Sequence, residues 1–116
     1  MRYTILAVDD EVNSLKVLSA ALSSEKFRVD TARSGEEAFA MFKDKQYDLI
    51  LSDYKMPGMT GEQLLEKVKT ISPEIPFVLL TAYGTIELAV NAMRLGAYTY
   101  LTKPVDLNHL ENVVND

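Results

Sequence analysis

The sequence predicts an α/β protein built on one parallel sheet with helices on both of its faces. Five short apolar runs recur along the 116 residues, and the segments between them carry the spacing of amphipathic helices. Three runs, TILAV, DLIL and FVLL, are almost wholly apolar, which is typical of strands buried on both faces of a parallel sheet. Strands that alternate with helices are joined by right-handed crossovers. We therefore expect five β–α pairs in one domain that spans residues 1–116.

Runs of branched and aromatic side chains define the predicted strands, which are Thr4–Val8, Phe27–Thr31, Tyr47–Ser52, Phe77–Thr81 and Tyr98–Thr102. After the first strand, Leu15, Leu18 and Leu22 recur at helical spacing and predict the buried stripe of a first helix. After the second strand, Ser34 can cap a second helix whose apolar residues recur in the same way.

The remaining helices have clear start and stop signals. A third helix opens at Thr60–Gly61–Glu62, and Pro73 and Pro76 follow its end. A fourth helix is expected over Thr85–Leu95, where Gly96 would end it. Asp106 can cap a fifth helix.

Composition and charge exclude several classes of protein. The chain has 12 Lys and Arg against 17 Asp and Glu, a net charge of −5, which disfavours a dedicated nucleic-acid-binding domain. It has no cysteine, so disulfides, thiolate metal sites and cysteine nucleophiles are excluded. A single histidine, His109, rules out a histidine-rich metal site. No stretch approaches the ~18 apolar residues of a membrane span, and no signal-peptide pattern is present, so we expect a soluble, cytoplasmic domain without membrane contact.

Polar residues follow four of the five predicted strands. They are Asp9 and Asp10 after the first, Asp53 after the third, Thr81 at the end of the fourth and Lys103 after the fifth. Taken singly, each has an ordinary explanation as a helix cap, a backbone partner or a solvated charge. Together they lie at the carboxyl edge of one parallel sheet, where such folds bind ligands.

This set of residues suits phosphoryl transfer. Asp9, Asp10 and Asp53 bring together like charges that a cation would neutralise, and Mg²⁺ prefers carboxylate oxygens. A carboxylate can also attack phosphorus to form an aspartyl phosphate, and Asp53 is the better candidate because its strand is central. Thr81 and Lys103 could then contact the phosphoryl oxygens, so that the protein supplies position and charge.

The same residues resemble the receiver domain of two-component response regulators. The similarity covers essentially the whole chain and includes DYKMPG at 53–58 and GAYTYLTKP at 96–104. It implies a flavodoxin-like, doubly wound sheet of five strands in the order 2-1-3-4-5 with five helices. It also implies a signalling switch that catalyses only its own phosphorylation and dephosphorylation, and that is not otherwise an enzyme.

The resemblance assigns roles to these residues. Asp53 would accept a phosphoryl group from the phosphohistidine of a sensor histidine kinase. Asp10 and Asp53 would bind Mg²⁺ directly, together with the backbone carbonyl of Lys55, and Asp9 would act largely through water. Thr81 and Lys103 would contact the phosphoryl oxygens.

Two further positions belong to the implied switch. Tyr100, otherwise an ordinary strand aromatic, would turn inward when Thr81 moves toward the phosphoryl group, which couples a charge event to packing. The bond between Lys103 and Pro104 would be cis, as it usually is in the family.

The predicted fourth helix carries two apolar stripes. At ~100° per residue, Ile86, Ala89, Val90 and Met93 should face the sheet, and Leu88, Ala92 and Leu95 should lie roughly opposite. We expect Leu88, Ala92 and Leu95, with the fifth strand and fifth helix, to form a homodimer or effector surface. The alternative is that neighbouring loops cover Leu88 or Leu95.

The segment from Thr81 to Pro104 is especially similar to receivers of the NtrC/DctD-like transcriptional activators, in which an ATPase domain and a DNA-binding helix-turn-helix follow. This chain has no phosphate-loop motif, and it ends at Asp116. We therefore expect a receiver taken from a longer transcription regulator, which itself makes no direct contact with nucleic acid. A free-standing receiver is the alternative.

Three other functions compete with the signalling switch. A Mg²⁺-dependent phosphohydrolase of the haloacid-dehalogenase type would carry D-x-D after its first strand, whereas Asp9 and Asp10 are adjacent here. A pseudo-receiver would bind partners without phosphorylation, but Thr81 and Lys103 complete the acidic site. His109 as a phosphodonor lies in the terminal helix, away from the strand ends.

Overall fold

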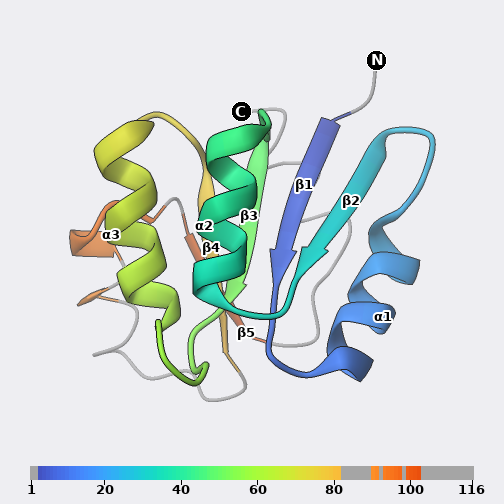
Figure 1. Cartoon of the computed structure of the whole chain (residues 1–116), viewed down its shortest axis with the longest axis horizontal. Coiled ribbons are helices and arrows are strands. Elements are labelled where there is room, and N and C mark those ends of the chain that lie inside the picture. The colour runs from blue at the N-terminus through green and yellow to red at the C-terminus, as the bar shows by residue number, and fades with distance from the viewer. Residues whose placement is uncertain (1–2, 82–89, 92, 98, 103–116) are drawn as a thin grey trace.

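The computed structural model describes residues 3–81, 90, 91, 93–97 and 99–102. In chain order the elements are β1 Tyr3–Val8, α1 Val12–Leu22, β2 Phe27–Ala32, α2 Gly35–Asp44, β3 Leu49–Asp53, α3 Gly61–Ile71, β4 Phe77–Thr81 and β5 Thr99–Thr102. The five strands form one parallel sheet in the order β2-β1-β3-β4-β5, which confirms the predicted topology (Figure 1). Most of the predicted fourth helix and all of the fifth lie outside the described residues.

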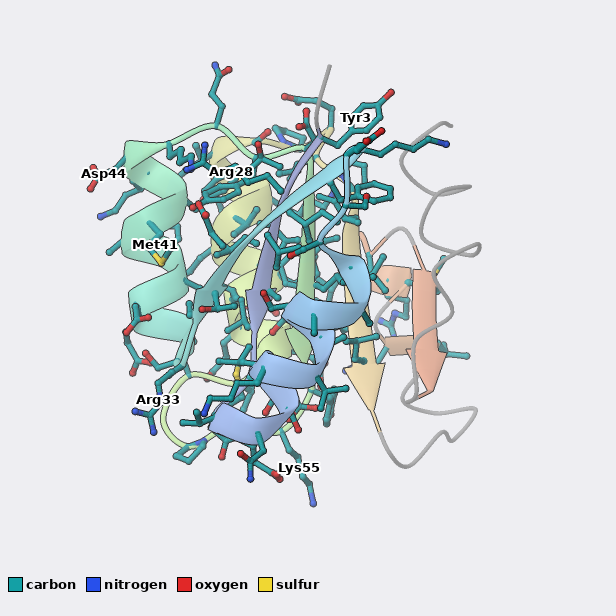
Figure 2. The ribbon with its side chains drawn as sticks, turned by 90° about the vertical axis from the view of Figure 1, so that its right-hand side faces the viewer. Tyr3, Arg28, Arg33, Met41, Asp44 and Lys55 are labelled. Carbon is teal, nitrogen blue, oxygen red and sulfur yellow. The ribbon has the colours of Figure 1, made fainter. Side chains whose placement is uncertain are left out.

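The central strands are buried on both faces, as their apolar runs predict. Alternate residues of β1, β3 and β4 belong to two different core clusters. One cluster includes Leu6, Ile50 and Phe77 and packs against α2 and α3, and the other includes Ile5 and Leu51 and packs against α1. Helices therefore cover both sides of the sheet, and Figure 2 shows α1 and α2 on its two sides. In the same view Lys55 and Arg33 lie at the end where the strands finish, and Tyr3 and Asp44 lie at the other end.

Local capping fixes where α2 and α3 begin. The Ser34 hydroxyl accepts a hydrogen bond from the Glu37 N–H at 3.0 Å, as the sequence predicts. Thr60 and Gln63 form a reciprocal capping box at the start of α3. None of the helices in the described part of the chain is long and apolar enough to cross a membrane.

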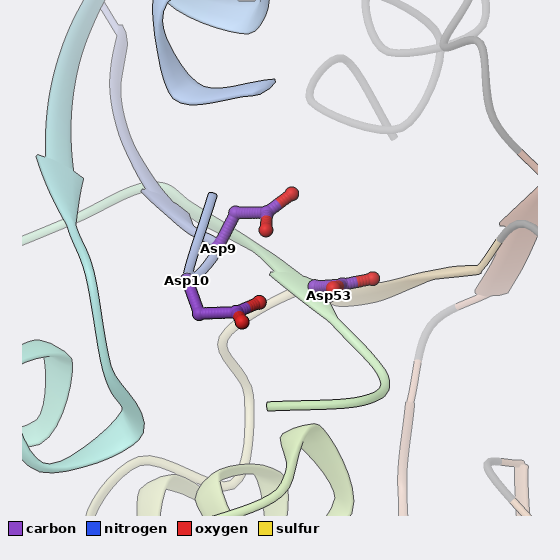
Figure 3. A group of neighbouring side chains, drawn as sticks. All are labelled: Asp9, Asp10 and Asp53. Atoms are coloured by element: carbon purple, nitrogen blue, oxygen red, sulfur yellow. The ribbon is translucent and has the colours of Figure 1, made fainter. Parts of the chain in front are cut away.

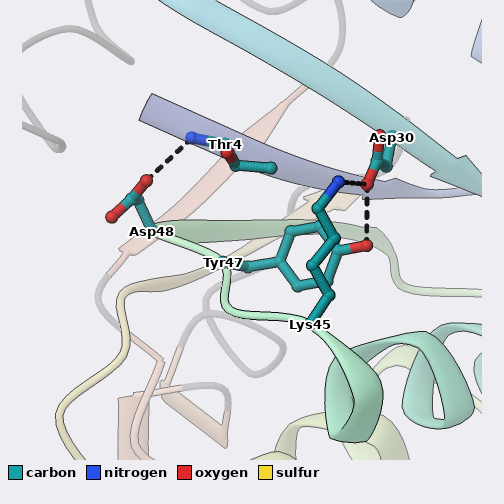
Figure 4. A network of polar contacts seen from close by, with 5 residues as sticks. All are labelled: Thr4, Asp30, Lys45, Tyr47 and Asp48. Atoms are coloured by element: carbon teal, nitrogen blue, oxygen red, sulfur yellow. Dashed lines mark hydrogen bonds and ion pairs between the residues drawn. The ribbon is translucent and has the colours of Figure 1, made fainter. Parts of the chain in front are cut away.

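The third strand begins later than predicted, at Leu49 instead of Tyr47. The two residues before it make side-chain contacts to other strands (Figure 4). The Tyr47 hydroxyl donates to Asp30 on β2 at 2.9 Å, and the Asp48 carboxylate accepts the Thr4 N–H at 2.7 Å. Lys45 also donates to Asp30, at 2.8 Å. Polar side chains therefore fasten the amino-terminal end of β3 where a strand was expected.

Asp30 is the centre of this network, and its protonation sets a pH dependence. Burial alone would raise the pKa of Asp30, but hydrogen bonds from Lys45 and Tyr47 outweigh burial and lower it below its usual value. Burial and the bond to Asp30 raise the pKa of Tyr47, which keeps the phenol neutral. A carboxyl whose pKa is lowered by folding stabilises the folded state above its unfolded pKa, and this stabilisation is lost as the pH falls through the folded pKa.

Replacing Tyr47 with phenylalanine is therefore expected to lower the free energy of unfolding by about 1 kcal/mol at pH 7. The loss should shrink at a pH low enough to protonate Asp30, because the protonated carboxyl no longer needs the donor. Urea unfolding at both pH values measures the difference. Tyr3→Phe is the matched control, since the Tyr3 ring contacts Phe27 with centroids 6.1 Å apart and this contact does not need the hydroxyl. An equal loss at both pH values would contradict the role given to Asp30.

The predicted orientation of the fourth helix is wrong where it is described. Residues 90, 91, 93 and 94 are helical, and Gly96, with φ of 101°, ends the segment as expected. However, Val90 and Met93 are 52% and 51% exposed instead of facing the sheet, and Leu95 packs partly against the core cluster of α2 and α3. The apolar pattern did not distinguish the two stripes, because either could have faced the sheet.

Candidate metal centre

Three carboxylates meet at the carboxyl end of the central strands. Oxygen atoms of Asp9, Asp10 and Asp53 all lie within 4.8 Å of one another (Figure 3). The strand register explains their proximity. Val8 on β1 is paired with Ser52 on β3, so the residues that follow them, Asp9 and Asp53, emerge side by side. The structure thus brings together the three acidic residues that the sequence singled out.

Asp9 is held where β1 turns into α1. Its side chain is 1% exposed, its N–H donates to the Ala32 carbonyl at 3.1 Å, and its Oδ1 accepts the Glu11 N–H at 3.0 Å. No side-chain cap precedes α1 itself, so this Asp9 bond orders the turn into the helix. Asp10, by contrast, is accessible to solvent.

Asp53 is positioned by the backbone around it. The Tyr54 N–H donates to the Leu80 carbonyl at 2.8 Å, and the Gly61 N–H donates to the Tyr54 carbonyl at 3.0 Å. Gly61 lies so close that a Cβ there would approach the Asp53 carbonyl oxygen to 2.3 Å. The first residue of α3 must therefore be glycine for Asp53 and α3 to keep this arrangement.

A shallow pocket of about 480 Å³ opens beside the acidic cluster. It is lined by Asp10, Tyr54, Lys55, Met56, Pro57 and Thr60. Within its wall, a hydrogen bond to the Glu62 carboxylate raises the pKa of Tyr54 to about 12, because the bond requires the neutral phenol. Lys55 and Asp10 line this same pocket.

The acidic cluster fits a magnesium ion by its chemistry. All three groups are oxygen donors, and Mg²⁺ takes one or two carboxylates together with water. Opposite ligands of octahedral Mg²⁺ lie about 4.2 Å apart. The span of 4.8 Å between the three carboxylates is only slightly wider. Small side-chain adjustments or one bridging water would close that difference.

The other predicted site residues are described only in part. The backbone of Thr81 ends β4, one residue beyond Leu80, which is paired with Asp53. Tyr100 on β5 is paired with Leu79, but the side chains of Thr81 and Tyr100 lie outside the described part of the chain. The predicted residues for which neither backbone nor side chain is described are Lys103, Pro104, Leu88 and Ala92.

From the sequence, Gly61 and Glu62 were expected only to begin a helix. Their contacts to Asp53, Tyr54 and Asn91 depend on how the loop after β3 folds back. The available signal in the sequence was a glycine, Gly61, at the first helical position directly before the acidic Glu62.

Comparison with known proteins identifies the family. The model of the response regulator receiver domain matches residues 5–115. The chain belongs to this family. The receiver domain is a signalling module, and the carboxylate cluster lies at the edge where the resemblance expected it.

Curated relatives of the receiver domain are transcription regulators. The transcriptional regulatory protein ZraR of Salmonella typhimurium is 38% identical over 110 residues, which cover 95% of this chain and 25% of ZraR. The transcriptional regulatory protein GlrR of Escherichia coli is 39% identical over 112 residues, which cover 97% of this chain and 25% of GlrR. These relatives confirm the predicted similarity to receivers of the NtrC/DctD-like group. The chain spans about a quarter of their length.

A solved receiver shares the fold of this chain. CheY of Borrelia burgdorferi, crystallised with CheX, BeF₃ and Mg²⁺, superimposes with a TM-score of 0.87 at 30% identity. The match covers 97% of this receiver domain and 86% of that chain. The flavodoxin-like expectation is thereby confirmed.

Proposed function

We propose that this receiver domain is phosphorylated on Asp53 and that the phosphoryl group switches its output surface. The clustering of Asp9, Asp10 and Asp53 at the carboxyl edge of the sheet carries the proposal. An acceptor carboxylate needs neighbouring groups that neutralise the charge of an incoming phosphoryl group. Asp10, Asp53 and the Lys55 carbonyl would hold Mg²⁺ directly, and Asp9 would hold it largely through water.

The transfer step follows from the carboxylate chemistry. A carboxylate oxygen of Asp53 attacks the phosphorus of a kinase phosphohistidine, the P–O bond forms, and the P–N bond breaks as the imidazole leaves and takes up a proton. Mg²⁺, when bound, would neutralise the phosphoryl oxygens. Thr81 would donate a hydrogen bond to one oxygen, and Lys103 would pair with another. Water then attacks the same phosphorus, the P–O bond to Asp53 breaks, and inorganic phosphate leaves with the free carboxylate restored, so the domain catalyses its own phosphorylation and dephosphorylation.

The receiver family and its curated relatives support the proposed partners. A sensor histidine kinase would be the phosphodonor, and ATPase and DNA-binding domains of a longer cytoplasmic transcription regulator would be the effectors. Receiver function then requires no contact with DNA or membrane by this domain. Tyr100 and a cis bond between Lys103 and Pro104 would form the internal part of the switch.

The phosphoacceptor assignment is tested with Mg²⁺ and acetyl phosphate as a small phosphodonor. Intact mass should show a single phosphoryl adduct that Asp53→Asn abolishes and Asp44→Asn, a carboxylate at the far end of α2, leaves unchanged. Many turnovers on unrelated phosphate esters would instead identify a phosphohydrolase. No adduct from acetyl phosphate or from a histidine kinase would identify a pseudo-receiver.

The proposed homodimer surface involves the fourth helix, β5 and the fifth helix. Val90 and Met93 are its contacts on the fourth helix in place of the predicted Leu88, Ala92 and Leu95, because both are half exposed and apolar whereas Leu95 packs on the core. We expect Val90→Asp and Met93→Asp to reduce association of the phosphorylated protein, measured by sedimentation. Val17→Asp, on the exposed side of α1 at 68% exposure, is the control. Association that survives both substitutions would exclude this surface.

A further inference from the structure

The first turn of α3 is fastened to the residues around Asp53. The Gly61 N–H donates to the Tyr54 carbonyl at 3.0 Å, and the Gly61 Cα lies against the Asp53 carbonyl. The capping box of Thr60 and Gln63 stiffens the same turn. Any rearrangement of the backbone at Asp53 is therefore transmitted to the beginning of α3.

The next residue, Glu62, connects this turn to the helical segment that follows β4. The Asn91 side-chain amide donates a short hydrogen bond to Glu62 Oε2. Asn91 is 29 residues away in sequence and lies on the segment that carries the exposed Val90 and Met93. The Glu62 carboxylate is the acceptor, so the bond is charge-assisted.

The other end of this segment also lies on α3. Gly96 faces the methylene groups of Lys69, since a Cβ at Gly96 would lie 3.6 Å from them. Leu95 packs on the core cluster that contains Leu65 and Val68 of α3. This second contact is apolar, whereas the contact between Glu62 and Asn91 is polar.

We propose that Glu62 and Asn91 form a latch that holds residues 90, 91 and 93–97 against α3 and opposes the rearrangement that phosphorylation of Asp53 produces. The inference rests on the proposed function and adds a positioning residue to it. Glu62 also accepts a hydrogen bond from the Tyr54 hydroxyl, so Asn91→Ala is the variant that removes the contact to the segment alone. Removing the latch should shift the conformational equilibrium away from the arrangement described here.

The size of the shift follows from the strength of one hydrogen bond. A net contribution of about 0.5–1.5 kcal/mol corresponds to a change of about 2- to 10-fold in an equilibrium constant. Linkage requires that a ligand which favours the rearranged state binds tighter by the same factor. Beryllofluoride with Mg²⁺, a stable mimic of the phosphoryl group, is such a ligand.

The test is a double-mutant cycle on the whole chain. Asn91→Ala and Glu62→Ala should each raise the affinity for beryllofluoride about 2- to 10-fold, and the double variant should show no further gain. Glu62→Gln, which keeps an acceptor oxygen, should restore most of the wild-type affinity. Affinity for Mg²⁺ alone should not change, and Glu66→Ala, an exposed carboxylate on the same helix, should leave both affinities unchanged. Additive effects, or an unchanged or weakened affinity in Asn91→Ala, would overturn the latch.

A second measurement needs no phosphoryl mimic. Amide hydrogen exchange at Leu95 and Gly96 should be faster in Glu62→Ala, which leaves the sequence of the segment intact. Unchanged exchange would overturn the latch even if Asp53 is phosphorylated normally. Faster exchange in a protein that forms no Asp53 adduct would support the contact between α3 and the segment, and would refute its link to phosphorylation together with the proposed function.

Discussion

Gly61→Ala is expected to destabilise the protein by about 3 kcal/mol and to slow phosphorylation of Asp53 by about 100-fold. The new Cβ would lie 2.3 Å from the Asp53 carbonyl oxygen and 2.8 Å from a methyl group of Leu79. The first obstacle is backbone, so it can yield only if β3 and α3 move apart. Such movement displaces the acceptor carboxylate, and small displacements of a reacting group are costly. Urea unfolding and the rate of adduct formation with acetyl phosphate measure the two effects.

Gly35→Ala provides the contrast. A Cβ at Gly35 would also come within 2.8 Å of another atom, but that atom is the Cβ of Met59, in the loop before α3, and not the backbone of Asp53. We expect a loss of stability here too, but an unchanged rate of phosphorylation. If Gly61→Ala lost stability but kept the normal rate, the coupling between α3 and Asp53 would be refuted.

Asp10→Asn is expected to have opposite effects with and without metal. Without Mg²⁺ the substitution removes one of three like charges within 4.8 Å, so the free energy of unfolding should rise by about 1 kcal/mol at low ionic strength. With Mg²⁺ the variant should become less stable to unfolding than the wild type, because its affinity for the ion falls at least about tenfold. Thermal unfolding across a Mg²⁺ titration should therefore show the two stability curves crossing.

Glu11→Gln is the matched control, since Glu11 is the next acidic residue and its hydrogen bond to Asp9 uses the backbone N–H. It should shift neither the metal-free stability nor the Mg²⁺ affinity by a comparable amount. A metal-free Asp10→Asn protein less stable than the wild type would show that repulsion among the three carboxylates does not limit the stability of the domain.

The fold was predictable because its three central strands, β1, β3 and β4, are short and consist mainly of apolar residues. The run FVLL is buried throughout, and no alternative to a two-sided strand suits it. The acidic cluster was predictable for a related reason. Once the strands are parallel, Asp9 and Asp53 must emerge from adjacent strands at one edge.

The start of β3, the orientation of the fourth helix and the bond between Glu62 and Asn91 could not be predicted, because in each case the sequence allows more than one arrangement. Tyr47 continues the apolar run of β3 in the sequence. Its hydroxyl, however, donates a hydrogen bond to Asp30, and the residue lies before the strand. Val90 and Leu95 lie on two apolar stripes of one helix, and only the packing of Leu95 on the core decides between them. The bond between Glu62 and Asn91 joins two ordinary surface residues and leaves no local pattern.

The polar network of Asp30, Lys45 and Tyr47 has a consequence for protein engineering. It fastens the chain before β3 begins, whereas the acidic cluster forms where β1 and β3 end. Thermostability and signalling chemistry can therefore be tuned independently: substitutions before β3 would change the denaturation midpoint of a biosensor built on this domain without altering its ion or phosphoryl response.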